Sequence, residues 1–133
     1  MASLFTRIVQ GEIPCHKVAE SADFLAFLDI SPRTKGHTLV IPKQEVDYIF
    51  DLDEAAYAGL WQFARQVAAA VEQVVPCERI GVAVIGLEVP HTHIHLVPLH
   101  GIGDINFSRP AFEITQEELA ELAQAISAKF AAG

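Results

Sequence analysis

The sequence predicts an α+β fold in which helices pack on an antiparallel sheet. Short apolar runs bounded by turn residues indicate strands, a long segment with apolar residues three and four apart indicates a helix, and a capping signal near the end indicates another. Their order along the chain is helix, three strands, long helix, two strands, helix, which is typical of the α+β class. At 133 residues the chain is expected to form one domain, residues 1–133.

The first third of the chain holds a short helix and a group of three strands. Leu4 to Gln10 is rich in apolar residues, and Gly11 follows as a helix stop. Three runs rich in β-branched and aromatic residues predict the strands Lys17–Ala19, Phe24–Leu28 and His37–Ile41. The first two are expected to form a hairpin, and the Pro- and Gly-containing stretch 30–36 is expected to be a turn.

A long amphipathic helix is predicted between Asp51 and Val75. Apolar residues recur there at the helical spacing, at Ala56, Leu60, Phe63, Val67, Val71 and Val74. Asp51 and Glu54 resemble a capping box, and Pro76 ends the pattern. The two strands expected after this helix are Arg79–Ile85 and Val89–Leu99.

The last predicted element is a C-terminal helix that begins near Thr115. Thr115 and Glu118 have the spacing of a capping box, and the helix is expected to run to about Phe130. The residues expected to face the core are Leu119, Leu122, Ala123 and Ile126.

Three histidines alternate inside an apolar run at His91, His93 and His95. Side chains alternate between the faces of a strand, so a strand here would project all three imidazoles from one face, opposite Ile94 and Leu96. Neutral imidazoles in a row can orient one another, bind a metal ion or attack a phosphorus atom. A purely structural row and a metal-binding row remain as alternatives.

The composition is that of a compact protein, with 51% hydrophobic and 20% charged residues. No apolar stretch reaches membrane-spanning length and no secretory signal is visible, so a cytoplasmic location is expected. The net charge of −8 argues against binding to nucleic-acid polymers. A mononucleotide is still compatible, because backbone N–H groups and imidazoles can bind one or two phosphates locally.

Several segments together resemble the histidine-triad (HIT) family, in its Hint-like branch. They are the histidine row with Leu96-Val97, and the stretches 11–14 (GEIP), 27–32 (FLDISP) and 36–43 (GHTLVIPK). The resemblance implies a HIT-like fold: a five-stranded antiparallel sheet, a long central helix, a short N-terminal helix and a C-terminal helix. It also implies homodimers whose sheets join, and nucleotide hydrolase or transferase activity.

The resemblance further implies roles for individual residues. The middle histidine, His93, would attack the α-phosphorus and form a nucleotidyl-histidine. His91 would orient His93, His95 would contact the phosphate, and His37 would support them. Asp29 would accept hydrogen bonds from the ribose hydroxyls, although a role as a turn cap is also open. The apolar slot for the base would be formed by Leu4, Phe5, Ile8, Phe27 and Ile30, for which ordinary core packing is the alternative.

The chain departs from the family pattern at two places. Many relatives carry a Cys-x-x-Cys that binds structural zinc with two histidines, whereas this chain has Ser3 and Thr6 there. With only His37 and His91 left as ligand candidates, no structural zinc is expected.

The second departure lies just before the histidine row. The stretch 84–89 lacks the expected Asn and has Leu87 in place of Gln, so phosphate binding is expected to depend on backbone N–H groups near Val89 and on His95. Glu88 stands where well-known relatives have a serine. It is either an exposed loop acid or, if protonated, a donor to an amine leaving group.

The expected function is therefore hydrolysis or transfer at the α-phosphate of a nucleoside phosphoramidate or dinucleoside polyphosphate. The substrate would be a purine nucleotide, and no cofactor is expected. The alternatives are a catalytically weak nucleotide-binding regulatory protein and a metal-binding protein that uses the histidine row.

Overall fold

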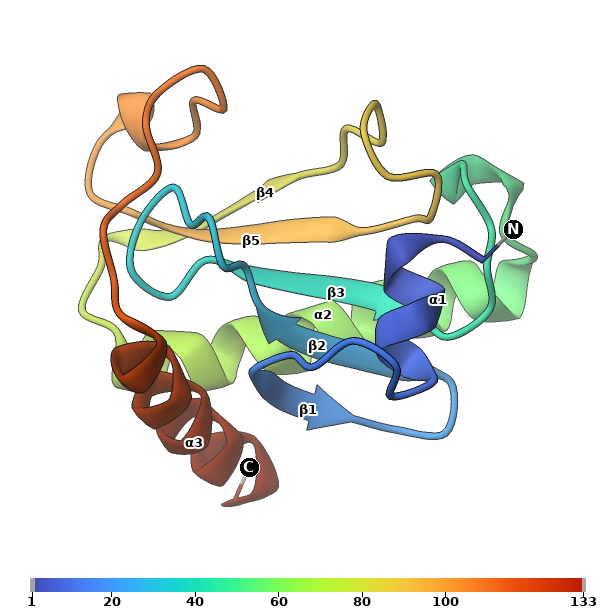
Figure 1. The fold of residues 1–133 in the computed structure, drawn as a ribbon, viewed down its shortest axis with the longest axis horizontal. Helices are drawn as coiled ribbons and strands as arrows, with labels where there is room; N and C mark the ends of the chain where they lie inside the picture. Colours follow the sequence, from blue (N-terminus) through green and yellow to red (C-terminus); the bar gives the residue numbers. More distant parts are fainter. Residues whose placement is uncertain (1, 133) are drawn as a thin grey trace.

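The computed structural model describes residues 2–132 and contains one five-stranded antiparallel sheet with three α-helices (Figure 1). The strand order is β1-β2-β3-β5-β4. The strands are β1 (Lys17–Glu20), β2 (Phe24–Leu28), β3 (Thr38–Pro42), β4 (Arg79–Ala83) and β5 (Ile94–Leu99). The helices are α1 (Leu4–Val9), α2 (Glu54–Val74) and α3 (Gln116–Ala132), with short 3-10 turns η1 (Ile49–Asp51) and η2 (Ile102–Asp104). The predicted α+β class and five-stranded sheet are confirmed.

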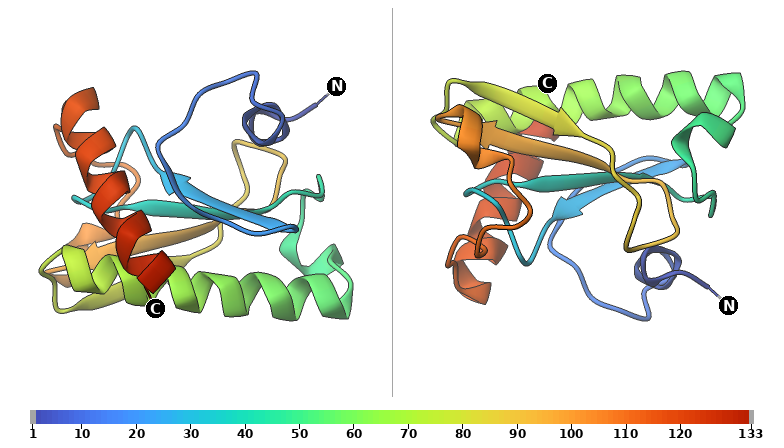
Figure 2. Two further views of the ribbon diagram at one scale, coloured as in Figure 1. Left: turned by 90° about the horizontal axis from the view of Figure 1, so that it is seen from below. Right: turned by 90° about the horizontal axis from the view of Figure 1, so that it is seen from above.

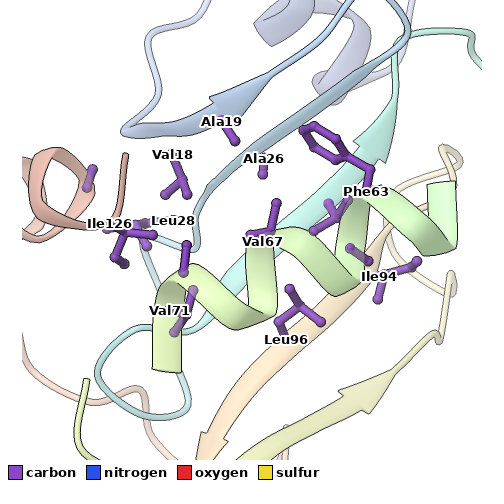
Figure 3. Close-up of a cluster of buried hydrophobic side chains, with 14 of the residues drawn as sticks. Val18, Ala19, Ala26, Leu28, Phe63, Val67, Val71, Ile94, Leu96 and Ile126 are labelled. Atoms are coloured by element: carbon purple, nitrogen blue, oxygen red, sulfur yellow. The ribbon is translucent and has the colours of Figure 1, made fainter. Parts of the chain in front are cut away.

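The two long helices and the short one cover opposite faces of the sheet. Helix α2 lies along one face, and α3 packs against α2 and β1, while α1 lies on the other face (Figure 2). The main core fills the space between sheet and α2, where Val67 and Leu96 are among the buried side chains (Figure 3). In α3, all four residues expected to face inward are buried there: Leu119, Leu122, Ala123 and Ile126.

A second, smaller core lies on the α1 face and forms because β2 is buried on both sides. Ala26 and Leu28 pack into the main core, whereas Leu25 and Phe27 alternate with them and pack toward Phe5 of α1. This alternation places Phe27 on the face that carries the site.

Helix α2 begins two residues later than the Asp51 cap predicts. Asp51 ends the turn η1, and the carboxylate of Asp53 accepts the N-cap hydrogen bond from the amide of Ala56 at 2.8 Å. At α3 the predicted box is present: the Thr115 amide donates to Glu118 Oε1 at 3.0 Å, and the Glu118 amide donates to Thr115 Oγ1 at 3.1 Å.

The prediction of a strand from Val89 to Leu99 is wrong at its beginning, because β5 starts only at Ile94. The His91 amide donates to Val89 O at 2.8 Å, and the Thr92 amide donates to Val46 O at 2.7 Å, so the chain bends instead of pairing. His91 and His93 therefore precede the strand, and only His95 belongs to it. The strand β4 likewise ends at Ala83, before the predicted Ile85, and β3 begins at Thr38 after the predicted His37.

Among residues 2–132, no helix is long and apolar enough to cross a membrane.

Candidate active site

A cavity of about 560 Å³ opens on the α1 face of the sheet. Its walls come from α1, the ends of β2 and β5, the β4–β5 connection and the segment after β5, and the last two of these lie on the α1 side of the sheet (Figure 2). All eight residues predicted to contact a nucleotide line it: Leu4, Phe5, Ile8, Phe27, Asp29, Ile30, Glu88 and Val89. Sequence segments far apart in the chain thus meet at one cavity.

The four predicted histidines divide into two that line the cavity and two that lie behind it. His93 and His95 are on the wall, with ring centroids 4.9 Å apart. His91 and His37 are almost completely buried and hold the first two in place. The four histidines therefore form two hydrogen-bonded pairs: His93 bonds to the backbone carbonyl of His91, and His37 bonds to His95.

The hydrogen bonds of His91 and His93 determine which nitrogen of His93 is free. His91 Nε2 lies 2.8 Å from the carbonyl oxygen of Pro42, an acceptor, so this nitrogen carries the proton and Nδ1 accepts from Ser3 Oγ at 2.8 Å. Burial lowers the pKa of His91, in agreement with a neutral ring. His93 Nδ1 in turn donates to the carbonyl oxygen of His91 at 2.7 Å. A neutral His93 consequently has its lone pair on Nε2.

The hydrogen bonds of His37 and His95 leave an N–H group facing the cavity instead of a lone pair. The Arg33 amide donates to His37 Nδ1 at 2.9 Å, so a neutral His37 carries its proton on Nε2 and donates to His95 Nδ1 at 3.0 Å. His95 then has its N–H on Nε2. Burial, aided by the charge of Arg33, lowers the pKa of His37 to about 4 although Asp29 opposes the shift, and burial lowers that of His95 to about 3. The cavity thus presents a lone pair on His93 and an N–H donor on His95.

Asp29, His37 and His95 also form a cluster whose possible ligand atoms lie within 4.8 Å of one another. The hydrogen bonds do not suit a cation. A metal bound at His37 Nε2 would require a proton on Nδ1, which already accepts from the Arg33 amide, and two N–H groups would then face each other. These three residues fit a hydrogen-bond relay better than a metal site.

The polar cluster around Ser3 and Thr6 contains no thiolate. Glu45 Oε1 accepts from the Ser3 amide at 2.7 Å and from Thr6 Oγ1 at 2.6 Å, while Ser3 Oγ contacts His91. Two hydrogen bonds lower the pKa of Glu45 to about 2. The sequence named His37 and His91 as the two histidines left to bind a zinc ion together with this segment. For His37 this is wrong, because its ring contacts His95, and Glu45 is the residue that contacts Ser3 and Thr6.

Asp29 caps the turn after β2 and also lines the cavity. Its Oδ1 accepts from the Ser31 amide at 2.8 Å, which is the turn cap, and its Oδ2 lies 3.6 Å from His37 Nε2. The side chain also lines the cavity and is partly exposed there. The carboxylate therefore keeps acceptor capacity for a ligand.

Arg33, Glu45 and Phe107 are among the residues of the site that sequence reasoning missed. Arg33 and Phe107 line the cavity, and the Phe107 ring lies 4.8 Å from that of His95. Arg33 lay in a stretch interpreted only as a turn, and Phe107 lay beyond the motif-bearing segments. An isolated aromatic residue in a polar loop was the one available signal for Phe107.

Comparisons with known proteins agree with this geometry. The family model described as "HIT domain" matches residues 10–102. The chain is similar to adenosine 5'-monophosphoramidase hnt1 of Schizosaccharomyces pombe, with 36% identity over 97% of this chain and 98% of that protein.

Two crystal structures have the same fold. A Hit-like protein involved in cell-cycle regulation from Bartonella henselae has a TM-score of 0.83 and 30% identity, covering 96% of this chain and 95% of that one. A Zn-bound histidine triad family protein from Mycobacterium smegmatis has a TM-score of 0.81 and 28% identity, covering 99% and 95%. Together with the family match over most of its length, these similarities establish that the chain belongs to the HIT, or histidine-triad, family.

Proposed function

We propose that this protein is a nucleotide hydrolase that cleaves nucleoside phosphoramidates or dinucleoside polyphosphates at the α-phosphate, through a nucleotidyl-His93 intermediate. The observation that carries the proposal is the lone pair on His93 Nε2, held in a cavity wall beside the N–H of His95. A nucleophile next to a donor suits an electrophilic phosphorus that carries anionic oxygens. The similarity to a named phosphoramidase supports the same reaction class.

One end of the cavity suits a purine nucleoside. Phe5 and Phe27 form an edge-to-face pair there, and Leu4, Ile8 and Ile30 extend the apolar wall. Asp29 lines the same cavity beside Ile30 in the chain, and its Oδ2 lies 3.6 Å from His37 Nε2, so its carboxylate would accept the ribose hydroxyls. This arrangement would leave the α-phosphate beside His93.

The phosphate oxygens have donors even without the missing Asn and Gln. His95 Nε2–H is one. Within residues 2–132, the amides of Leu87, Glu88 and Val89 make no intramolecular hydrogen bond, and these residues line the cavity. Backbone N–H groups of this kind bind anions well.

The reaction would proceed in two displacements. His93 Nε2 forms a bond to phosphorus as the bond to the leaving group breaks, and the leaving group takes a proton from water. Water then attacks the phosphorus, the bond to Nε2 breaks, and the proton released by this water balances the one taken earlier. His95, neutral and with its pKa at about 3, acts as a hydrogen-bond donor throughout.

The test is turnover of adenosine 5′-phosphoramidate and of a dinucleoside polyphosphate by the wild type and by His93→Ala. We expect the variant to lose at least about a thousand-fold in kcat/KM while its melting temperature stays close to that of the wild type. The exposed His100→Ala serves as the matched control. Turnover by His93→Ala at the wild-type rate would remove the covalent mechanism.

A second candidate is a nucleotide-binding protein with little turnover and a regulatory role. It is favoured by the β4–β5 connection, where Leu87 is exposed in place of an amide side chain. Micromolar AMP binding by a wild-type protein that hydrolyses neither substrate would select this candidate.

We also propose that residues 1–133 act as one domain, that two copies join at β4, and that the protein is cytoplasmic. Strand β4 is the sheet edge and carries Val82 with half of its surface exposed, so a second β4 has a free row of backbone groups to pair with. Cys15 and Cys77 are both free thiols, which suits a reducing compartment.

A further inference from the structure

A series of aromatic rings runs from the proposed base slot past the histidines. The centroid distances are 5.6 Å for Phe27–Phe5, 5.0 Å for Phe5–His93, 4.9 Å for His93–His95 and 4.8 Å for His95–Phe107. Among the described residues, Phe107 makes ring contacts with His95 and His37 and none with Phe5 or Phe27, so the series reaches Phe107 only through the histidines. The cavity therefore has an aromatic residue at each end.

The segment that carries Phe107 is fixed by contacts to the turn before β3. Arg33 Nη1 donates to the carbonyl oxygen of Arg109 at 2.6 Å, and the Phe112 amide donates to the carbonyl oxygen of Pro32 at 2.7 Å. The Arg33 guanidinium also lies 5.6 Å from the centre of the Phe107 ring. These contacts make the Arg33–Phe107 pair a preformed part of the wall.

The chemistry proposed above requires space at this end. In an in-line displacement the leaving group departs on the side of the phosphorus opposite to His93 Nε2. The nucleoside would fill the slot of Phe5 and Phe27, so the leaving group must use the rest of the cavity. Arg33 and Phe107 form its wall beyond His95.

We propose that Arg33 and Phe107 form a leaving-group subsite that prefers a planar aromatic group over an aliphatic one. This inference rests on the proposed function. Phe107 still exposes 39% of its surface although it lines the cavity, which leaves ring area for an incoming aromatic group. The guanidinium beside it disfavours a cationic aliphatic amine and can stack on a second flat ring.

The test compares two adenosine 5′-phosphoramidates, those of benzylamine and of cyclohexylmethylamine, which differ mainly in the aromaticity of one ring. Binding is measured by calorimetry with His93→Ala, which does not consume the ligands, and turnover is measured with the wild type. We expect the benzyl compound to bind about three- to tenfold more tightly.

Substitutions at Phe107 should remove this preference. Phe107→Leu keeps an apolar side chain without a π face, so it should bind both compounds about equally, and Phe107→Ala should do the same with lower affinity for each. Phe112→Ala is the matched control, since this exposed ring belongs to the same segment and does not line the cavity. The control should keep the preference.

Equal binding of both compounds to His93→Ala, or an unchanged preference in Phe107→Leu, would overturn the subsite. A clear preference in binding, combined with no turnover of either compound by the wild type, would uphold the subsite and overturn the proposed function. Failure of both compounds and of AMP to bind would overturn both proposals.

Discussion

Hydrogen-bond direction at single nitrogen atoms decides what the histidines can do. The backbone carbonyl oxygen of His91 leaves the His93 lone pair on Nε2, whereas the Arg33 amide, acting through His37, leaves a proton on Nε2 of His95. The two rings thus present opposite polarity to one cavity. This difference depends on which nitrogen of each ring is held in a hydrogen bond.

The neutral histidines predict how stability depends on pH. The folded-state pKa is about 4 for His37 and about 3 for His95, below the ordinary value of 6.5, so between these values the unfolded chain binds protons that the folded chain does not. The free energy of unfolding should therefore fall as the pH drops from about 7 to about 5. This pH range lies above the pKa values of most carboxyl groups.

Urea unfolding at the two pH values measures this effect, with His95→Gln as the comparison. The variant lacks one of the titrating groups, so its loss of stability on acidification should be smaller. An equal loss in both proteins would place the pH dependence elsewhere.

Asp29 provides a prediction about sugar recognition. A carboxylate that accepts two ribose hydroxyls should contribute roughly ten- to a hundred-fold in affinity. Asp29→Ala should therefore weaken AMP by this factor and leave 2′,3′-dideoxy-AMP nearly unchanged in calorimetry. Asp29→Asn is the control for the turn, because its side-chain oxygen can still accept from the Ser31 amide. Equal losses for both nucleotides would make Asp29 purely structural.

At the scale of elements, α1 is attached to the sheet by a polar cluster in addition to apolar packing. Ser3, which caps α1, contacts both Glu45 and His91, and Phe5 packs on His93. The same short helix therefore supports the proposed base slot and the orientation of His91. A change at this attachment should alter the site as well as stability.

The polar cluster of Ser3, Thr6, Glu45 and His91 predicts that the purified protein contains little zinc. It offers one imidazole, one carboxylate and two hydroxyls, a poor set for tetrahedral zinc. The purified protein should contain well under one zinc per chain, and EDTA should change neither its melting temperature nor its activity.

The positive control replaces the same positions with zinc ligands. Ser3 Oγ and Thr6 Oγ1 both lie near His91 Nδ1, and Glu45 contacts Thr6. The triple variant Ser3→Cys, Thr6→Cys, Glu45→His should therefore bind about one zinc per chain, as measured by elemental analysis. One tightly held zinc in the unmodified protein, lost together with the fold on chelation, would contradict the metal-free account.

The sequence predicted the elements well where local rules determine them. Hydrophobic spacing identified α2 and α3, and turn residues separated β1 from β2. The alternation of histidines with apolar residues correctly placed Ile94 and Leu96 in the core. The bend before β5 was not predictable, because its partner is the carbonyl oxygen of Val46, far away in the sequence. The same reason explains why Glu45 and Phe107 were missed: each reaches the site through long-range contacts.

At the scale of the whole molecule, the exposed edge at β4 predicts self-association. The protein should elute as a dimer in size-exclusion chromatography with light scattering, and Val82→Lys should weaken the dimer at least about tenfold by placing two charges at the pairing edge. Ile102→Lys, at a fully exposed apolar position outside β4, is the control. A monomeric wild-type protein, or no effect of Val82→Lys, would exclude β4 as the interface.

Nucleophilic attack by His93 at an α-phosphorus would leave a covalent intermediate on the protein, and this intermediate can be trapped. The wild type is mixed with an adenosine 5′-phosphoramidate, quenched within the first turnover and analysed by intact-protein and peptide mass spectrometry. We expect one adenylyl group attached to the peptide that contains His93, and none in His93→Ala. Turnover without any adenylyl-protein, or adenylation that persists in His93→Ala, would contradict nucleophilic attack by His93.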